Sequence, residues 1–221
     1  MDDRLHAIFD RQKQLTLHFR PIESANGFHN HCPTFGVDLN NAFAQAKLKD
    51  SAWRVTEELT EATDHLTTGD HRKLCEEIID AYHFLVEMSL IAGMEYIDCV
   101  PNRSPLAEDP LFPMNDGDDC LEELFLMAAR AKAEASIEQL DIRLSAYAVI
   151  EYVGKACNAL KNRPWRQSFT ATDKGAFYAN MTEAHVAFAL LCIACNIDPQ
   201  TLHDGYFHKS SINFNRIEEG R

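Results

Sequence analysis

Residues 53–88 read WRVTEELTEATDHLTTGDHRKLCEEIIDAYHFLVEM, and this stretch decides the fold. Apolar residues recur every three or four positions on both sides of Thr67-Thr68-Gly69-Asp70, which is the helical period. A turn this short joins two adjacent, antiparallel helices. The same spacing continues through almost the whole chain, and no alternating two-residue period is convincing. The sequence therefore predicts an all-α protein built around an antiparallel helix hairpin.

Polar stretches rich in proline or glycine separate the expected helices. Pro21 to Leu39 predicts a loop, and Val100 to Asp119 contains four prolines and five acidic residues. The chain is expected to form a single domain, residues 1–221, in which the segment at about 95–135 is inserted or mobile. Helices are expected near residues 3–18, 50–66, 70–93, 120–133, 136–162, 173–196 and 199–217.

Composition narrows the class of protein. The 221 residues include 21 basic and 34 acidic side chains, a net charge of −13 that disfavours nucleic acid and anionic membranes as partners. No apolar run of the roughly 18 residues that span a bilayer is evident, and the polar start does not resemble a signal peptide. A cytoplasmic location is expected. The seven cysteines, an odd number at mostly apolar helical positions, predict reduced thiols in the core.

Two pairs of acidic residues stand at matching heights on the expected hairpin. Glu61 and Glu77 each lie eight residues from Gly69, and Glu58 and Asp80 each lie eleven. At about 1.5 Å of rise per residue, all four stand roughly 12 to 17 Å from the turn. Each pair flanks the apolar stripe of its helix on the same rotational side. The pairs are expected to converge, although the handedness of the hairpin does not follow from spacing.

Converging carboxylates repel one another unless a cation neutralises them. Ligation by oxygen alone calls for a hard divalent cation, and Mg²⁺ fits best because it shares its coordination sphere with substrate phosphates; Mn²⁺ could substitute. The plainer alternative is that both acidic pairs are solvated helix faces. A di-iron bundle is less favoured, because such sites usually carry a Glu-x-x-His motif, whereas Glu61 and Asp80 stand at that position here.

Five short motifs together resemble a known superfamily. They are Glu58-x-x-Glu61, Glu77-x-x-Asp80, the D-x-x-H-F segment at 80–84, a late K-x-x-x-N-x-x-R element at 209–216 and Gln12-Lys13-Gln14-Leu15-Thr16. The pattern resembles the all-α nucleoside triphosphate pyrophosphatases, which include MazG-like enzymes. It is most similar to the branch of dimeric dUTPases and phage dCTPase/dUTPases. That branch has Q-x-x-L-N where this chain has threonine at 16.

The resemblance implies a helical bundle of that type, acting as a homodimer on a deoxynucleoside triphosphate. It implies Mg²⁺-dependent hydrolysis of dUTP, and of dUDP, to dUMP by a water molecule. Glu61 would be the catalytic base and, with Glu58, Glu77 and Asp80, a metal ligand. Lys209 and Arg216 would bind phosphates. Contacts to the nucleoside would come from Gln12, Thr16, Phe84 and Asn213.

The densest basic patch of this acidic chain is Gly154 to Gln167. Pro164 ends the expected helix there, so Lys161 and Arg163 are candidates for a second phosphate clamp. The alternative is a surface corner anchored by Trp165.

Base specificity stays open at this point, because related phage enzymes accept dCTP as well as dUTP and MazG-like relatives accept many nucleotides. A function of another class is also open: a non-catalytic helical module whose acidic hairpin binds a basic partner protein.

Overall fold

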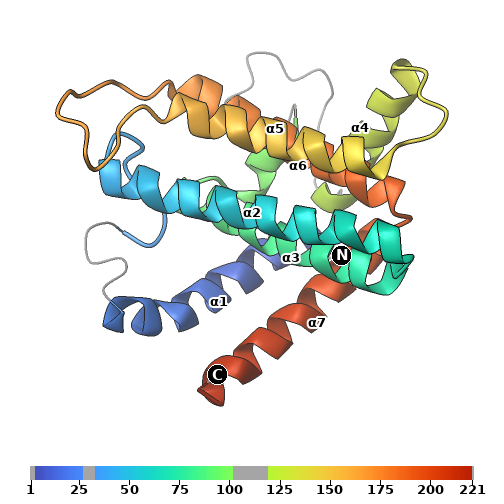
Figure 1. Ribbon diagram of the computed structural model, residues 1–221, viewed down its shortest axis with the longest axis horizontal. Coiled ribbons are helices and arrows are strands. Elements are labelled where there is room, and N and C mark those ends of the chain that lie inside the picture. The colour runs from blue at the N-terminus through green and yellow to red at the C-terminus, as the bar shows by residue number, and fades with distance from the viewer. Residues whose placement is uncertain (1–2, 27–32, 102–118, 221) are drawn as a thin grey trace.

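The computed structural model describes residues 3–26, 33–101 and 119–220. Within these ranges the chain is helical and contains no strand, which confirms the all-α prediction. Seven α-helices and one short 3₁₀ helix follow in the order α1 Arg4–Ala25, α2 Ala42–Thr68, α3 His71–Ile91, η1 Tyr96–Cys99, α4 Cys120–Glu134, α5 Ile142–Ala159, α6 Lys174–Ala194 and α7 Pro199–Glu218 (Figure 1).

Helices α2 and α3 form the expected antiparallel hairpin (Figure 1). Gly69 ends α2 in the left-handed conformation with φ of 71°, which a glycine adopts without steric cost. Asp70 then caps α3 by accepting a hydrogen bond from the backbone N–H of Lys73. The facing apolar stripes, which include Leu59 and Ile78, are fully buried. Local capping and apolar spacing therefore suffice to build the hairpin.

Several expected boundaries are wrong. Helix α1 continues through Pro21 to Ala25, where a loop was predicted, because a proline removes only one of the backbone hydrogen bonds of a helix. Helix α2 begins at Ala42, since the side chain of Asn41 caps its first turn. Helix α5 begins at Ile142 rather than near 136. Ser136, with φ of 55°, ends the preceding helix in the left-handed conformation.

Helices α5 and α6 pack side by side, and α5 also packs on α2 (Figure 1). By length and composition α6 could span a membrane, which the sequence analysis did not expect. Half of its most apolar stretch is buried inside the fold, as in a core helix that is apolar on all sides. Cys192 on this helix and Cys195, which directly follows it, are buried free thiols, in agreement with the expected core cysteines.

Helices α1 and α7 pack against each other and against α3 (Figure 1). Gly205 allows this approach, because a Cβ at that position would lie 2.3 Å from Cδ1 of Ile79. Within the segment expected to be inserted, α4 buries Leu121 and Leu124 in the common core. Residues 102–118 of that segment lie outside the described residues. The fold thus brings both terminal helices, α1 and α7, against α3 of the hairpin.

Candidate metal centre

Three of the four predicted carboxylates meet between α2 and α3. Glu58, Glu77 and Asp80 each place one ligand atom within 4.8 Å of the other two. The handedness of the hairpin, which spacing left open, therefore turns the two acidic flanks toward each other. Glu61 is exposed and is not part of this group, although its negative charge acts on both Glu58 and Glu77.

The cluster carries excess negative charge in a partly buried setting. Burial, and then the charges of Asp80, Glu61 and Glu77, raise the pKa of Glu58 to about 7. Burial and the charges of Asp80 and Glu61 raise the pKa of Glu77 as well. A divalent cation would neutralise this repulsion, and the donor set, carboxylate oxygens at close range, fits Mg²⁺ or Mn²⁺.

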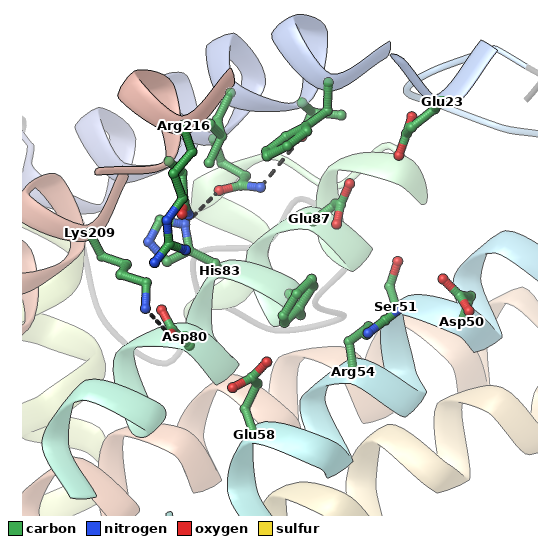
Figure 2. Close-up of a pocket in the computed structure, with 16 residues that line it drawn as sticks. Glu23, Asp50, Ser51, Arg54, Glu58, Asp80, His83, Glu87, Lys209 and Arg216 are labelled. Carbon is green, nitrogen blue, oxygen red and sulfur yellow. Dashed lines mark hydrogen bonds and ion pairs between the residues drawn. The ribbon is translucent and has the colours of Figure 1, made fainter. Parts of the chain in front are cut away.

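A cation of the chain itself already reaches the cluster. Lys209 on α7 donates a hydrogen bond from Nζ to Oδ2 of Asp80, as the dashed line in Figure 2 marks. Burial raises the pKa of Asp80, while Lys209 and the charge of Arg216 oppose that rise. The two basic residues predicted as phosphate ligands thus stand beside the carboxylates predicted as metal ligands.

A pocket of about 470 Å³ opens from this cluster between α1, α2, α3 and α7 (Figure 2). Its volume is typical of sites for small organic ligands. Glu77 and Glu61 are not among the residues that line it. The predicted site residues that do line it are Gln12, Thr16, Glu58, Asp80, Phe84, Lys209, Asn213 and Arg216.

A buried hydrogen-bond network orders the wall of the pocket. Oε1 of Gln12 accepts from the hydroxyl of Tyr206 at 2.6 Å and lies 2.9 Å from Nδ1 of His83. Burial and the charge of Lys209 lower the pKa of His83 to about 3, so the imidazole is neutral and Nδ1 carries the proton toward Gln12. The ring stacks on Tyr206 with centroids 3.7 Å apart. Gln12 is thereby held rigidly at the pocket surface.

The opposite end of the pocket holds residues that the sequence analysis missed. They are Glu23, Asp50, Ser51, Arg54 and Glu87, and Figure 2 shows them away from Lys209. Burial raises the pKa of Glu87 to about 7, with Lys47 opposing the rise and Glu23 and Asp50 adding to it. The position of Glu87 could have been predicted from helical spacing, because Glu87 follows Asp80 by seven residues, about two turns along the same face of the helix.

Lys161 and Arg163, the predicted second phosphate clamp, do not line the pocket. They follow α5, which packs on α2 and α6, whereas α1, α3 and α7 wall the pocket together with α2. Their charges instead act on Lys49, whose Nζ donates to the carbonyl of Leu160 at 2.8 Å and whose pKa is lowered mainly by burial. Arg163 lies over the ring of Trp165, which is 75% exposed. This arrangement agrees with the alternative interpretation of the basic patch, a surface corner anchored by Trp165.

The carboxylate group, the two basic side chains and the adjoining pocket make up the candidate site. Comparisons of this chain with protein-family models, with curated proteins and with solved structures gave no match.

Proposed function

We propose that this chain is a Mg²⁺-dependent nucleoside triphosphate pyrophosphatase that hydrolyses dUTP, and dUDP, to dUMP. One observation carries the proposal: two of the three convergent carboxylates, Glu58 and Asp80, line the same pocket as the cationic Lys209 and Arg216, and this pocket is large enough for a nucleoside. Carboxylates alone suit a cation, and basic side chains alone suit an anion. Both together suit a polyphosphate bound with its metal.

Glu58, Glu77 and Asp80 are the residues that would hold the ion. Bound Mg²⁺ neutralises phosphate oxygens and lowers the pKa of a coordinated water molecule. The apolar and amide side chains nearby would hold the nucleoside, with Phe84 against a ring face and Gln12 and Asn213 offering amide hydrogen bonds.

Lys209 would exchange partners during the reaction. Without substrate it neutralises Asp80. With a divalent cation at the carboxylates, the ammonium group of Lys209 would be free to bind a phosphate, and Arg216 beside it offers a planar fork for two phosphate oxygens. The ion pair that Lys209 loses with Asp80 would thus be offset by the ion pair that it gains with a phosphate.

Glu61 stands at the exposed edge of the cluster, which suits the role of general base better than that of a buried ligand. In the proposed step the water oxygen bonds to the α-phosphorus, the bond to the bridging oxygen breaks, and pyrophosphate leaves. The water proton passes to Glu61. With dUDP the leaving group is phosphate. A homodimer remains part of the proposal.

The test is pyrophosphate release from dUTP, dCTP, dTTP, dATP, dGTP and UTP, with MgCl₂ and with EDTA. We expect dUTP to be hydrolysed in MgCl₂ and not in EDTA. Glu61→Gln should lower kcat by about 100-fold or more, since that is the usual contribution of a general base. Glu151→Gln is the matched control, because Glu151 is exposed on α5 and pairs with Lys155 at 2.8 Å. Silence on every nucleotide would contradict the proposal and favour a module that binds a basic protein.

A further inference from the structure

The far end of the pocket is built from three helices. Glu87 comes from α3, Glu23 from α1 and Asp50 from α2, and all three line the same pocket as the carboxylate cluster (Figure 2). Glu58 and Asp80 lie at one end and these residues at the other. The pocket therefore presents two chemically different ends to an elongated ligand.

Helical geometry gives the spacing between the ends. On α3, Asp80, Phe84 and Glu87 line the pocket on successive turns, so Glu87 stands about 10 Å along the helix from Asp80. On the antiparallel α2, Glu58 and Ser51 repeat this step in the opposite direction. A nucleotide whose phosphates lie at Lys209 would pass its sugar by Phe84 and turn the edge of its base toward Glu87.

A second observation points to a ligand in this pocket, at the end beside Lys209 and Arg216 (Figure 2). His83 lines the pocket and is only 5% exposed. Its Nδ1 is paired with Gln12, but its Nε2 is buried without a hydrogen bond of normal geometry within the described part of the chain. A buried polar atom of this kind is unfavourable unless a ligand or water satisfies it.

We propose that Glu87 reads the exocyclic group of the base, accepting a hydrogen bond from the amino group of cytosine when ionised and donating one to O4 of uracil when protonated. The inference rests on the proposed nucleotide substrate and deepens it, since it assigns base selection to one side chain. A carboxylate accepts only, and a carboxylic acid also donates, so the two forms select opposite exocyclic groups.

The groups that face Glu87 keep both forms accessible. Lys47 on α2 favours the carboxylate, whereas Glu23 on α1 and Asp50 on α2 disfavour it, and burial places the pKa at about 7. Arg54 lines the same pocket and is paired with Glu57 at 3.3 Å. On the same helix His83 is neutral at this pH. Preference for dCTP over dUTP should therefore increase as the pH rises through about 7.

The experiment measures kcat/KM for dCTP and dUTP with MgCl₂ between pH 6 and pH 8. We expect the dCTP/dUTP ratio to rise at least about tenfold, because the ionised form of Glu87 favours cytosine and the protonated form favours uracil. In Glu87→Gln the ratio should be flat, since an amide both donates and accepts at every pH. Glu76→Gln, on the exposed face of α3, should keep the wild-type slope.

Calorimetric binding of dCMP and dUMP in MgCl₂ separates this inference from the proposed activity. If the wild type hydrolyses nothing but binds the two monophosphates with a pH-dependent ratio that Glu87→Gln removes, the assignment of Glu87 stands and the hydrolase proposal fails. A flat ratio in the wild type, an unchanged slope in Glu87→Gln, or no binding of either monophosphate would overturn the assignment.

Discussion

Lys209 on α7 donates its ammonium hydrogen bond to Asp80 on α3, two residues separated by 129 positions in the chain. The contact joins the C-terminal helix to the acidic hairpin and neutralises part of a cluster whose members raise one another's pKa. A divalent cation would compete for the same carboxylate. We therefore expect stability, cation binding and phosphate binding to be coupled through this pair.

Mg²⁺ should stabilise the protein more at pH 8 than at pH 6. Because the folded-state pKa of Glu58 is raised to about 7 from 4.5, the cation-free protein loses stability as the pH rises from about 4.5 through 7. Bound Mg²⁺ removes that repulsion, and a hundredfold excess over Kd corresponds to about 2.7 kcal/mol. Thermal unfolding with MgCl₂ or EDTA measures the shift. Glu77→Gln should abolish it and Glu151→Gln, at an exposed ion pair with Lys155 on α5, should keep it; equal shifts in both would refute a metal centre here.

Replacing Lys209 by methionine should destabilise the cation-free protein by about 1 to 3 kcal/mol, because Asp80 is left partly buried without its partner. MgCl₂ should restore part of the loss, and KM for the triphosphate should rise. Denaturant unfolding in EDTA and in MgCl₂ gives both free energies. Lys13→Met, at an exposed pair on α1, is the control. Wild-type stability of the Lys209 variant in EDTA would argue against the coupling.

The close approach of α7 to α3 can be tested with a double-mutant cycle. Gly205→Ala gains about 1 kcal/mol of helix propensity, but its methyl group would meet Cδ1 of Ile79. Ile79→Val removes that atom. We expect Gly205→Ala to be about 1 kcal/mol or more better tolerated in the Ile79→Val background, measured as free energy of unfolding. Additive effects would mean that the two helices are not in this contact.

Acid should destabilise the fold through a buried histidine that does not line the pocket. His185 is fully buried, its Nε2 lies 2.9 Å from Oγ of Ser89, and burial lowers its pKa to about 3. The unfolded chain takes up a proton below about 6.5 while the folded chain does not, so stability falls as the pH drops toward 3. At pH 5 the loss is about 2 kcal/mol.

His185→Gln should remove this contribution. The difference in unfolding free energy between pH 7 and pH 5 should then be about 2 kcal/mol smaller than in the wild type, whatever the variant's stability at pH 7. An identical difference would show that His185 does not titrate on unfolding.

Helices and the hairpin were predictable because they depend on neighbours in sequence. The apolar period, the caps at Asp70 and Asp198 and the glycine at 69 act within a few residues of themselves. Errors arose where two local signals compete. Pro21 predicted that α1 would end before it, but the helix continues to Ala25. The helix expected from residue 136 begins only at Ile142.

For the candidate site, spacing placed Glu58, Glu77 and Asp80 at one level, and the structure brings them together. Glu61 has the same spacing yet stays at the exposed edge. Two residues on one helix three positions apart point about 60° apart around its axis, so only the angle between packed helices decides which of them faces inward.

The sequence by itself determined the presence of the helices and the equal distances of the two acidic pairs from the turn at Gly69. It also determined that Lys209 and Arg216 lie on one face of the last helix. Only the tertiary structure decided that Lys209 and Arg216 reach the acidic cluster, that Lys161 and Arg163 do not line its pocket, and that Glu87 shares the pocket with Glu23. The physical reason is the separation in sequence of the residues that interact. Helix periodicity and capping are interactions over about four residues, whereas a pocket forms where distant helices pack, and its composition depends on their crossing angles and on close contacts such as Gly205 with Ile79.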